Sequence, residues 1–304
     1  MKLVESVRAE AYQLASRAMA ARTVVRRDNV QFRMRVTGVR MLGTAMRRIT
    51  FTAPELRTFE LTGPDEYFGL LMPGANGSLV LPPDGRRDVR AAIAEMPAEV
   101  APGLRWYTIR AHRPELAEID VDIVGHEVEA SPGVPAEGEG AAALHTAGAG
   151  WAPGARWAAA ATVGDEAGFR GGGSCYHPGG SARRRLLVAD ETALPALAAI
   201  LESDGWGWPA EDVEVHIEVP SVAAVGAESL PAGVSVHERG GAEPGALVLP
   251  ALQARLSAGQ SVDYAWVCGE SGLITAGRRL LVDAGVDRRR ILFSGYWKLG
   301  SARG

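Results

Sequence analysis

The chain has 304 residues, of which 47% are hydrophobic and 22% are charged, a composition typical of a soluble globular protein with room for two domains. Its formal net charge of −4 argues against non-specific binding to nucleic acid. The two cysteines cannot build a disulfide framework, which favours a reduced, cytoplasmic setting. No uninterrupted apolar run has the length and character of a membrane-spanning helix.

Residues 1–28 are predicted to form a helical extension. Leu3, Val7, Leu14 and Ala18 fall near one helical face, while two glutamates interrupt the segment, which lacks the continuous apolar region of a targeting peptide. We expect this helix to pack on the body of the protein or on a second chain, so an oligomer formed through it is one expectation.

Residues 29–182 contain short alternating runs separated by glycine and proline, which predict an antiparallel sheet or small β-barrel. The expected strands are 30–42, 46–53, 76–82, 105–112 and 118–128. A segment rich in Gly, Pro and Glu, residues 129–150, interrupts this domain and has the composition of a flexible surface loop.

Residues 183–304 alternate between strand-like and helix-like runs, which predicts a parallel sheet with helices on both faces. The expected strands are 185–189, 213–220, 234–239, 264–270 and 289–297, and the expected helices are 192–203, 250–258 and 273–285. Asp190 to Leu194 follow the first strand, where ligands bind in open α/β sheets. Thr192 can cap the next helix, whose free N–H groups suit a phosphate. The glycine fingerprint of a standard Rossmann fold is absent.

The stretch "RWYTIR", residues 105–110, is unusual for a strand. Two arginines, a tyrosine and a tryptophan lie within six residues, where a strand built only for packing would carry Val, Ile or Leu. The residues alone also allow a simpler interpretation, a strand with a surface arginine and a half-buried tyrosine.

Several stretches together resemble the siderophore-interacting protein family, which are FAD-dependent, NAD(P)H-driven ferric-siderophore reductases. The matching stretches, in the family's order, are 63–73, 105–110, 120–126, 153–158, 163–165, 190–197, 266–271 and 295–300. The resemblance implies a ferredoxin-reductase-like fold: an N-terminal antiparallel β-barrel that binds FAD, followed by an α/β parallel-sheet domain that binds NAD(P)H. It also implies non-covalent FAD rather than FMN.

By resemblance, the strand over residues 105–110 holds the flavin. Arg105 would pair with the FAD pyrophosphate, since a guanidinium forms bidentate bonds to phosphate. Tyr107 would lie against the isoalloxazine ring and Thr108 would bond near its N5 atom, which gives these two residues the catalytic roles. Alternation places Thr108 on the opposite face from the other two, so the assignment requires a bend there. His126 would contact the flavin or its ribityl chain, or else serve a structural role.

The turn over residues 152–158 would bind the FAD phosphates through Gly154, Ala155 and Trp157, with the tryptophan as an anchor. The family carries serine where this chain has Ala155, and about twenty extra residues (127–150) precede the turn. The resemblance therefore implies the loss of one phosphate hydrogen bond, which would weaken FAD binding by about tenfold or more. Whether this loss and the insertion abolish FAD binding is left open.

The remaining sites also follow from the resemblance. The nicotinamide cofactor, NADPH or NADH, would meet the ends of two strands, and two arginines would either read the 2′-phosphate of NADPH or form a solvated face. These residues are Asp190, Glu191, Thr192, Ala193, Gly269 and Glu270, with Arg278 and Arg279 for the phosphate. Cys268 would only line the site. The ferric siderophore, or another small-molecule substrate, would meet Arg48 and Lys298, with Arg47 as a further candidate.

No His, Cys, Asp or Glu cluster has the spacing of a metal site, consistent with iron that arrives and leaves inside its chelator. Two other functional classes stay open. One is an enzyme of secondary metabolism that uses this scaffold for another flavin reaction or a non-redox reaction. The other is a non-catalytic protein that binds flavin or siderophore.

Overall fold

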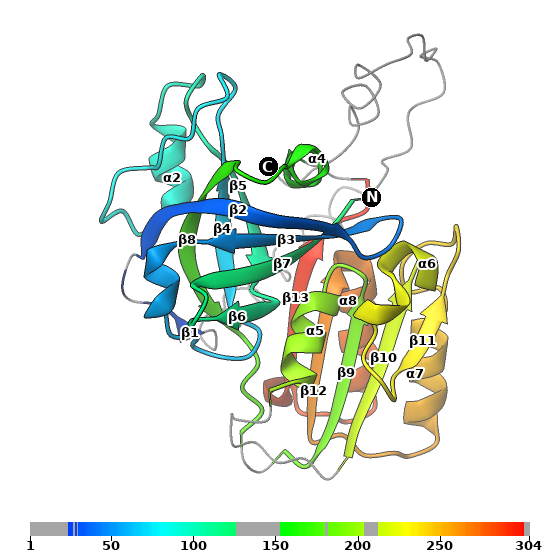
Figure 1. Ribbon diagram of the computed structural model, residues 1–304. Coiled ribbons are helices and arrows are strands. Elements are labelled where there is room, and N and C mark those ends of the chain that lie inside the picture. The colour runs from blue at the N-terminus through cyan, green and yellow to red at the C-terminus, as the bar shows by residue number, and fades with distance from the viewer. Residues whose placement is uncertain are drawn as a thin grey trace, which may run out of the picture.

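A computed structural model describes residues 24–26, 28, 30–125, 153–179, 182–203 and 212–300. Two sheets organise these residues, an antiparallel one built from the first half of the chain and a parallel one built from the second (Figure 1). Among the helices in these ranges, none has the length and apolar character needed to cross a membrane.

The first sheet is antiparallel throughout, with the strand order β5-β4-β8-β2-β3-β7-β6 and β1 paired to β8. Its strands are β1 (Val24–Val25), β2 (Gln31–Met41), β3 (Met46–Thr52), β4 (Tyr67–Met72), β5 (Gly103–Thr108), β6 (Ala111–Arg113), β7 (Glu118–Val124) and β8 (Glu166–Ser174). The short helices η1 (Pro54–Arg57), α2 (Val89–Ala94) and α4 (Pro153–Ala160) join it. Val24 and Val25, at the end of the predicted helical extension, form a strand, as expected of β-branched residues.

The sheet closes into a barrel between β5 and β6. The Ile109 N–H donates to Glu66 O at 2.8 Å, next to β4, and the Arg110 N–H donates to Asp120 O at 2.8 Å, on β7. Two successive residues therefore join the two edges of the sheet. The interior is filled by aromatic rings: Phe169 stacks on Phe68 at 4.8 Å and on Phe32 at 4.5 Å.

Several elements of this domain differ from the sequence prediction. Strand β4 was not among the expected strands, and the predicted turn over residues 152–158 is the helix α4. Residues 76–82 form no strand, so that prediction is wrong; Leu79 and Leu81 there pack by side-chain contact on a cluster that includes Leu71 and Leu104. Helix α2 was not predicted. Strand β8 was not predicted because it contains three successive glycines, which leave a weak local signal.

The second sheet is parallel, with the strand order β11-β10-β9-β12-β13. Its strands are β9 (Arg184–Asp190), β10 (Asp212–Val219), β11 (Ser235–Glu238), β12 (Tyr264–Glu270) and β13 (Ile291–Trp297). The helices are α5 (Leu194–Leu201), α6 (Val222–Val225), η2 (Ala227–Ser229), α7 (Val248–Ser257), α8 (Ser271–Asp283) and η3 (Arg288–Arg290). Helix α5 packs on one face, and α7 and α8 pack on the other. The prediction of a parallel sheet covered on both faces is confirmed.

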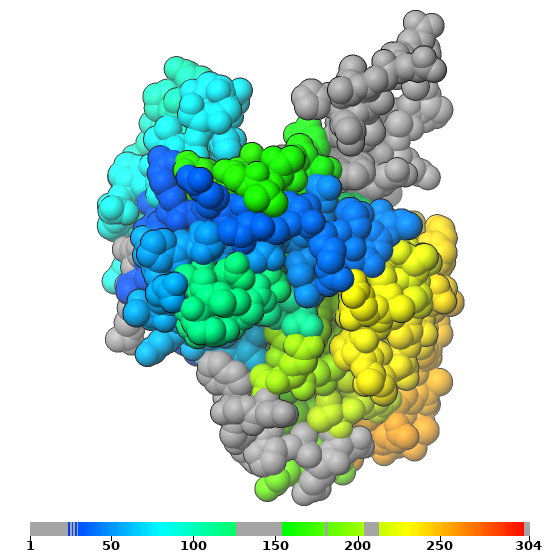
Figure 2. Space-filling model, in the orientation of Figure 1, coloured from blue at the N-terminus to red at the C-terminus, as the bar shows by residue number. Residues whose placement is uncertain are grey.

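The hairpin between β2 and β3 joins the barrel to the second domain through the main chain. The N–H groups of Thr44 and Ala45 donate to the carbonyls of Ala223 and Ala224, both at 2.9 Å. A Cβ added to Gly43 would lie 2.4 Å from the Ala224 carbonyl oxygen, so only glycine permits this approach. Figure 2 shows this blue hairpin lying against the yellow surface of the α6 region. The carboxyl end of β10, which leads into α6, thus faces the barrel.

Candidate functional site

The predicted flavin strand is β5, which includes Arg105, Tyr107 and Thr108. This strand ends at Thr108, and β6 begins at Ala111 after the crossing of the barrel described above. Tyr107 is half-buried and packs on the barrel core, and Thr108 pairs with Tyr67 in the neighbouring strand. The pairing of β5 with β4 stays in regular register through Thr108, and the chain leaves the strand only after this residue, so the role of Thr108 at the flavin stays a prediction.

Helix α4 lies directly over the predicted flavin strand. A Cβ added to Gly154 would lie 2.1 Å from the Tyr107 hydroxyl oxygen and 3.1 Å from Arg105 Cγ. Ala155 is buried, and Trp157 stacks on Phe51 at 6.0 Å, which anchors the helix in the barrel core. The structure thus brings together the two segments that the resemblance implicates in FAD binding, and Trp157 serves as an anchor.

The other end of α4 is fixed by Arg47. Its guanidinium donates to the carbonyl oxygens of Ala158 and Ala159, both at 2.6 Å. These carbonyls have no partner within the helix, and a cation favours the negative end of the helix dipole. Arg47, a candidate for substrate binding, thus serves the helix that overlies Arg105 and Tyr107.

The electrostatics beside α4 favour an anion. Burial lowers the pKa of Arg105, and the guanidinium of Arg90 in α2 lowers it further, although the Tyr107 phenol opposes the shift. Burial raises the pKa of Tyr107, so its ring stays neutral. Two cations held near each other are stabilised by a bound anion. The residues present therefore suit a diphosphate group, and the charge of Arg90 in α2 acts on Arg105 in addition.

Asp190, predicted to bind the nicotinamide cofactor, is fully buried and tied to the ends of three strands. One carboxylate oxygen accepts from Thr192 N at 2.8 Å, Thr192 Oγ1 at 2.6 Å and Ala193 N at 3.3 Å. The other accepts from Glu270 N at 2.7 Å and Trp297 Nε1 at 2.8 Å. Burial, followed by the charge of Glu191, raises the pKa of Asp190 to about 7. Both oxygens thus serve the protein itself.

The neighbouring acidic residues also have internal partners. Glu191 forms a buried, bidentate ion pair with Arg239, with both bonds at 2.7 Å. Glu270 caps its own helix, α8, by accepting from the Gly272 and Leu273 N–H groups. A Cβ on Gly269 would collide with the Asp190 carboxylate. These residues shape the carboxyl edge of the sheet rather than presenting charged oxygens to a ligand.

Two residues of this edge were missed by the sequence prediction, Arg239 and Trp297. Trp297 lies in the stretch 295–300 that resembles the family, which was its only signal. Arg239 lies in the strand-like run 234–239, and nothing in the sequence pairs it with Glu191, 48 residues away.

The structure places Arg278 and Arg279 away from this edge. Helix α8 begins at the carboxyl edge and runs back along the sheet, so residues seven or eight positions in lie about 10 Å away. The Arg278 guanidinium stacks on the Phe293 ring at 4.6 Å, and Arg279 is exposed. Arg279 therefore lies on a solvated face, as the alternative interpretation has it, whereas Arg278 packs on the domain, and the role of both in cofactor choice stays a prediction.

The two predicted substrate residues have different surroundings. Arg48 forms a bidentate ion pair with Asp122, at 2.6 and 2.8 Å, and Asp122 raises its pKa. Lys298 is exposed and follows Trp297 at the carboxyl edge. Of the two, Lys298 is the cation at this edge.

His126 and the insertion 127–150 lie outside the described residues. Cys268 is buried, which raises the pKa of its thiol well above the usual value and leaves it protonated, as expected of a lining residue. Within the described ranges, no group of three or more His, Cys, Asp or Glu residues could hold a metal ion.

Two family models match this chain in succession. Residues 35–175 match the siderophore-interacting FAD-binding domain, and residues 182–300 match the siderophore-interacting protein model. The chain belongs to the siderophore-interacting protein family. The two matches meet in the linker between β8 and β9, where the antiparallel sheet gives way to the parallel one.

Relatives in this family share the fold over most of their length. The chain is 26% identical to the ferric vibriobactin reductase ViuB of Vibrio cholerae over 261 residues, which cover 83% of this chain and 84% of ViuB. A siderophore utilization protein from T. fusca is 27% identical, with a TM-score of 0.67 and coverage of 92% and 98%. The siderophore-interacting protein SipS from Aeromonas hydrophila is 25% identical, with a TM-score of 0.61 and coverage of 90% and 93%. The predicted family and fold class are confirmed.

Proposed function

We propose that this protein transfers electrons from NAD(P)H through bound FAD to a ferric siderophore, from which iron is released as Fe(II). The observation that carries the proposal is the close packing of the first turn of α4 on Arg105 and Tyr107, in a chain whose barrel matches a FAD-binding domain. The similarity to ViuB supports the ferric siderophore as the substrate class.

In this proposal the barrel residues hold the cofactor. Arg105 binds the diphosphate, assisted by Arg90 and the first N–H groups of α4. Tyr107 supports the isoalloxazine ring, and Thr108 bonds near N5. When bound, FAD supplies the chemistry that matches a two-electron hydride donor to Fe(III), which accepts one electron at a time.

The second domain supplies the nicotinamide side. Asp190 holds the ends of β9, β12 and β13 in one arrangement, and thereby fixes the Trp297 indole at the carboxyl edge. Gly269 has no side chain, which leaves room for the Asp190 carboxylate at this edge. Lys298 would attract an anionic chelate to this edge and raise the encounter rate. NADPH and NADH are both compatible with these contacts.

The test begins with purified protein to which FAD is added. The yellow protein should bleach when NADPH or NADH is added without oxygen, and regain its colour when a ferric chelate is added, with Fe(II) captured by a ferrous-specific dye. Arg105→Ala should weaken FAD binding about 10- to 150-fold, as expected for a lost charge-assisted bond. Arg35→Ala is a matched control, because Arg35 is an exposed barrel arginine 3.8 Å from Glu166.

A protein that cannot take up FAD would refute the proposal. That result would favour an enzyme that uses the scaffold for another reaction, an alternative motivated by Ala155, whose buried position lacks the serine hydroxyl found in the family. A protein that binds FAD but is not reduced by either nicotinamide would instead be a binding protein.

A further inference from the structure

Two histidines bond to each other in the second domain, apart from the proposed flavin site in the barrel. His216 of β10 and His237 of β11 approach through ring nitrogens, with Nδ1 of the first 3.1 Å from Nε2 of the second. The other ring nitrogen of His216 lies 2.9 Å from Glu214 Oε1, and Glu214 Oε2 accepts from Arg255 Nε in α7 at 2.6 Å. The four side chains thus form a continuous chain of hydrogen bonds from α7 to the strand β11.

These hydrogen bonds fix where the protons lie. Burial raises the pKa of Glu214, but the bonds from His216 and Arg255 outweigh it and hold this pKa below its usual value. Glu214 is therefore ionised and can only accept, so His216 Nε2 must carry a proton. The contact between the two rings then has room for one proton, because two N–H groups facing each other at 3.1 Å would repel. Two neutral rings or one charged ring can form this contact, and two charged rings cannot.

The surroundings of the contact also disfavour a second proton. Burial lowers the pKa of His237, the charge of His216 lowers it further, and the charge of Glu218 in β10 opposes the shift. The Glu218 carboxylate is already used by the main chain at the start of α7, from which it accepts N–H bonds. Arg255 and Glu214 form an ion pair and so offset each other. His237 is therefore harder to protonate in the folded protein than in the unfolded chain.

The strand that His237 belongs to is weakly attached to the sheet. Strand β11 lies at the edge of the sheet, and none of its four residues is buried. Directly after it, the N–H groups of Arg239 and Gly240 donate to main-chain carbonyls at the end of β10, both at 2.9 Å. Arg239 also forms the bidentate ion pair with Glu191 at the carboxyl edge. Release of β11 would therefore move the partner of a residue predicted to bind the nicotinamide cofactor.

We propose that the contact between His216 and His237 is a pH-sensitive latch: it holds β11 on the sheet while the two rings carry at most one extra proton, and it releases β11 and Arg239 when both rings are charged. A histidine that is harder to protonate in the folded state contributes stability that is complete above about pH 6.5 and is lost as the pH falls. The latch is therefore closed at neutral pH and opens in acid. It needs neither flavin nor nicotinamide, so it is independent of the proposed reductase function.

The test is amide hydrogen exchange of the full chain without added cofactor, between about pH 7.5 and 5, with each rate divided by the intrinsic rate at that pH. Protection of the Arg239 and Gly240 amides should fall about tenfold per pH unit below about 6.5, because opening then takes up one proton. His237→Gln keeps an N–H donor for His216 Nδ1 but cannot be protonated, so its protection should not change with pH. His237→Ala lacks the bond, so its protection should already be about three- to tenfold lower than that of the wild type at neutral pH.

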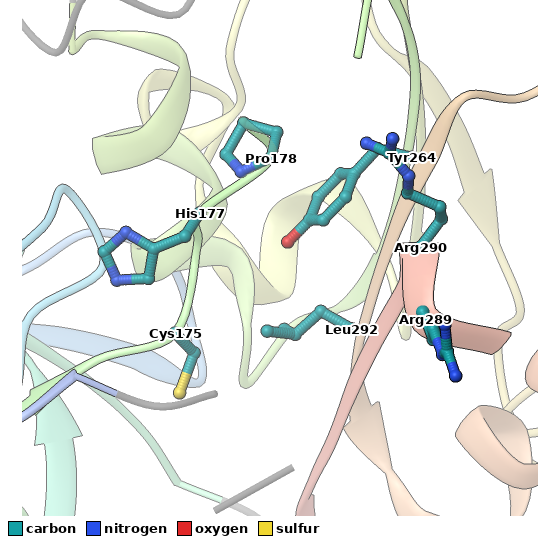
Figure 3. A pocket seen from close by; sticks show the side chains of 7 residues that line it. All are labelled: Cys175, His177, Pro178, Tyr264, Arg289, Arg290 and Leu292. Atoms are coloured by element: carbon teal, nitrogen blue, oxygen red, sulfur yellow. The ribbon is translucent and has the colours of Figure 1, made fainter. Parts of the chain in front are cut away.

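His177→Gln is the matched control. Burial lowers the pKa of His177 too, but this ring contacts Ser174 Oγ at 3.0 Å and lines a cavity of about 350 Å³ beside the linker that follows β8 (Figure 3). The control should keep the full pH dependence at Arg239 and Gly240.

Proton NMR of the imidazole rings gives a second readout. His216 and His237 should take up protons in two separate steps in the wild type, and His216 should titrate in a single step in His237→Gln. Four results would overturn the proposal: protection of the Arg239 amide that does not change with pH in the wild type, the same slope in His237→Gln, loss of the slope in His177→Gln, or independent titration of the two rings.

Discussion

Replacing Gly154 with alanine should destabilise the protein, although alanine is the better helix former. A Cβ at this position would lie 2.1 Å from the Tyr107 hydroxyl oxygen, which forces α4 or the ring to move. Overpacking of this kind destabilises by about 1–3 kcal/mol, while the higher helix propensity of alanine relative to glycine stabilises by about 1 kcal/mol. We expect a net loss of up to about 2 kcal/mol in the free energy of unfolding.

The second half of this prediction is a rescue by Tyr107→Phe, which removes the clashing oxygen and keeps the ring. The closest contacts of the new Cβ then become 3.1 Å to Arg105 Cγ and 3.2 Å to the ring carbon Cζ, which small shifts relieve. A double-mutant cycle should therefore give a coupling energy of about 1–2 kcal/mol. FAD affinity should fall in Gly154→Ala and recover in the double variant.

The assay is urea unfolding of the two single variants, the double variant and a control, followed by FAD titration. Gly241→Ala is the control, because a Cβ there would meet no atom within 4 Å. If Gly154→Ala matches the wild type in stability, or if Tyr107→Phe does not rescue it, then α4 does not lie on Tyr107 as described. The flavin site built from these two segments would then need a different geometry.

Three further predictions follow from the site and its surroundings. Burial raises the pKa of Asp65 from 3.8 to about 6, so this carboxyl stabilises the folded protein at low pH and loses about 3 kcal/mol of that stability as the pH rises through about 6. In urea unfolding at a series of pH values, the free energy of unfolding should therefore decline less between about pH 4 and 7 in Asp65→Asn than in the wild type. Changing Arg278 and Arg279 together to alanine should alter KM for NADPH and NADH equally, and a selective rise for NADPH would restore them as readers of the 2′-phosphate. Arg48→Ala should lower the free energy of unfolding by about 2–3 kcal/mol because it leaves buried Asp122 unpaired. Lys298→Ala should leave stability unchanged and raise KM for an anionic chelate. The reverse pattern would make Arg48 the substrate residue and Lys298 the structural one.

The parallel sheet could be predicted closely from the sequence because its strands are locally marked. Strand β12 is buried along its whole length, and its predicted bounds, 264–270, match the structure. The barrel was harder to predict. Strand β8 carries glycines because a Cβ on Gly172 would collide with the Tyr67 ring, a requirement of a neighbouring strand that no local pattern reveals.

The candidate site could also be predicted only in part, because some of its residues belong to local motifs and others are defined by contacts with distant residues. Arg105, Tyr107 and Gly154 belong to short motifs, and the structure brings them together. The partners of Asp190 come from strand ends up to 107 residues away, so the sequence could mark Asp190 as important but not show that its carboxylate serves the protein. Likewise, Arg48 and Asp122 are paired by the register of β3 and β7, 74 residues apart.

The glycine contact between the two domains has a mechanical consequence. Gly43 and Gly226 let the β2–β3 hairpin and the α6 segment meet backbone to backbone, and a Cβ on Gly226 would lie 1.9 Å from the Leu42 carbonyl oxygen. Rotation of one domain against the other would break the main-chain bonds of Thr44 and Ala45 together. We therefore expect the angle between the domains to stay constant throughout turnover.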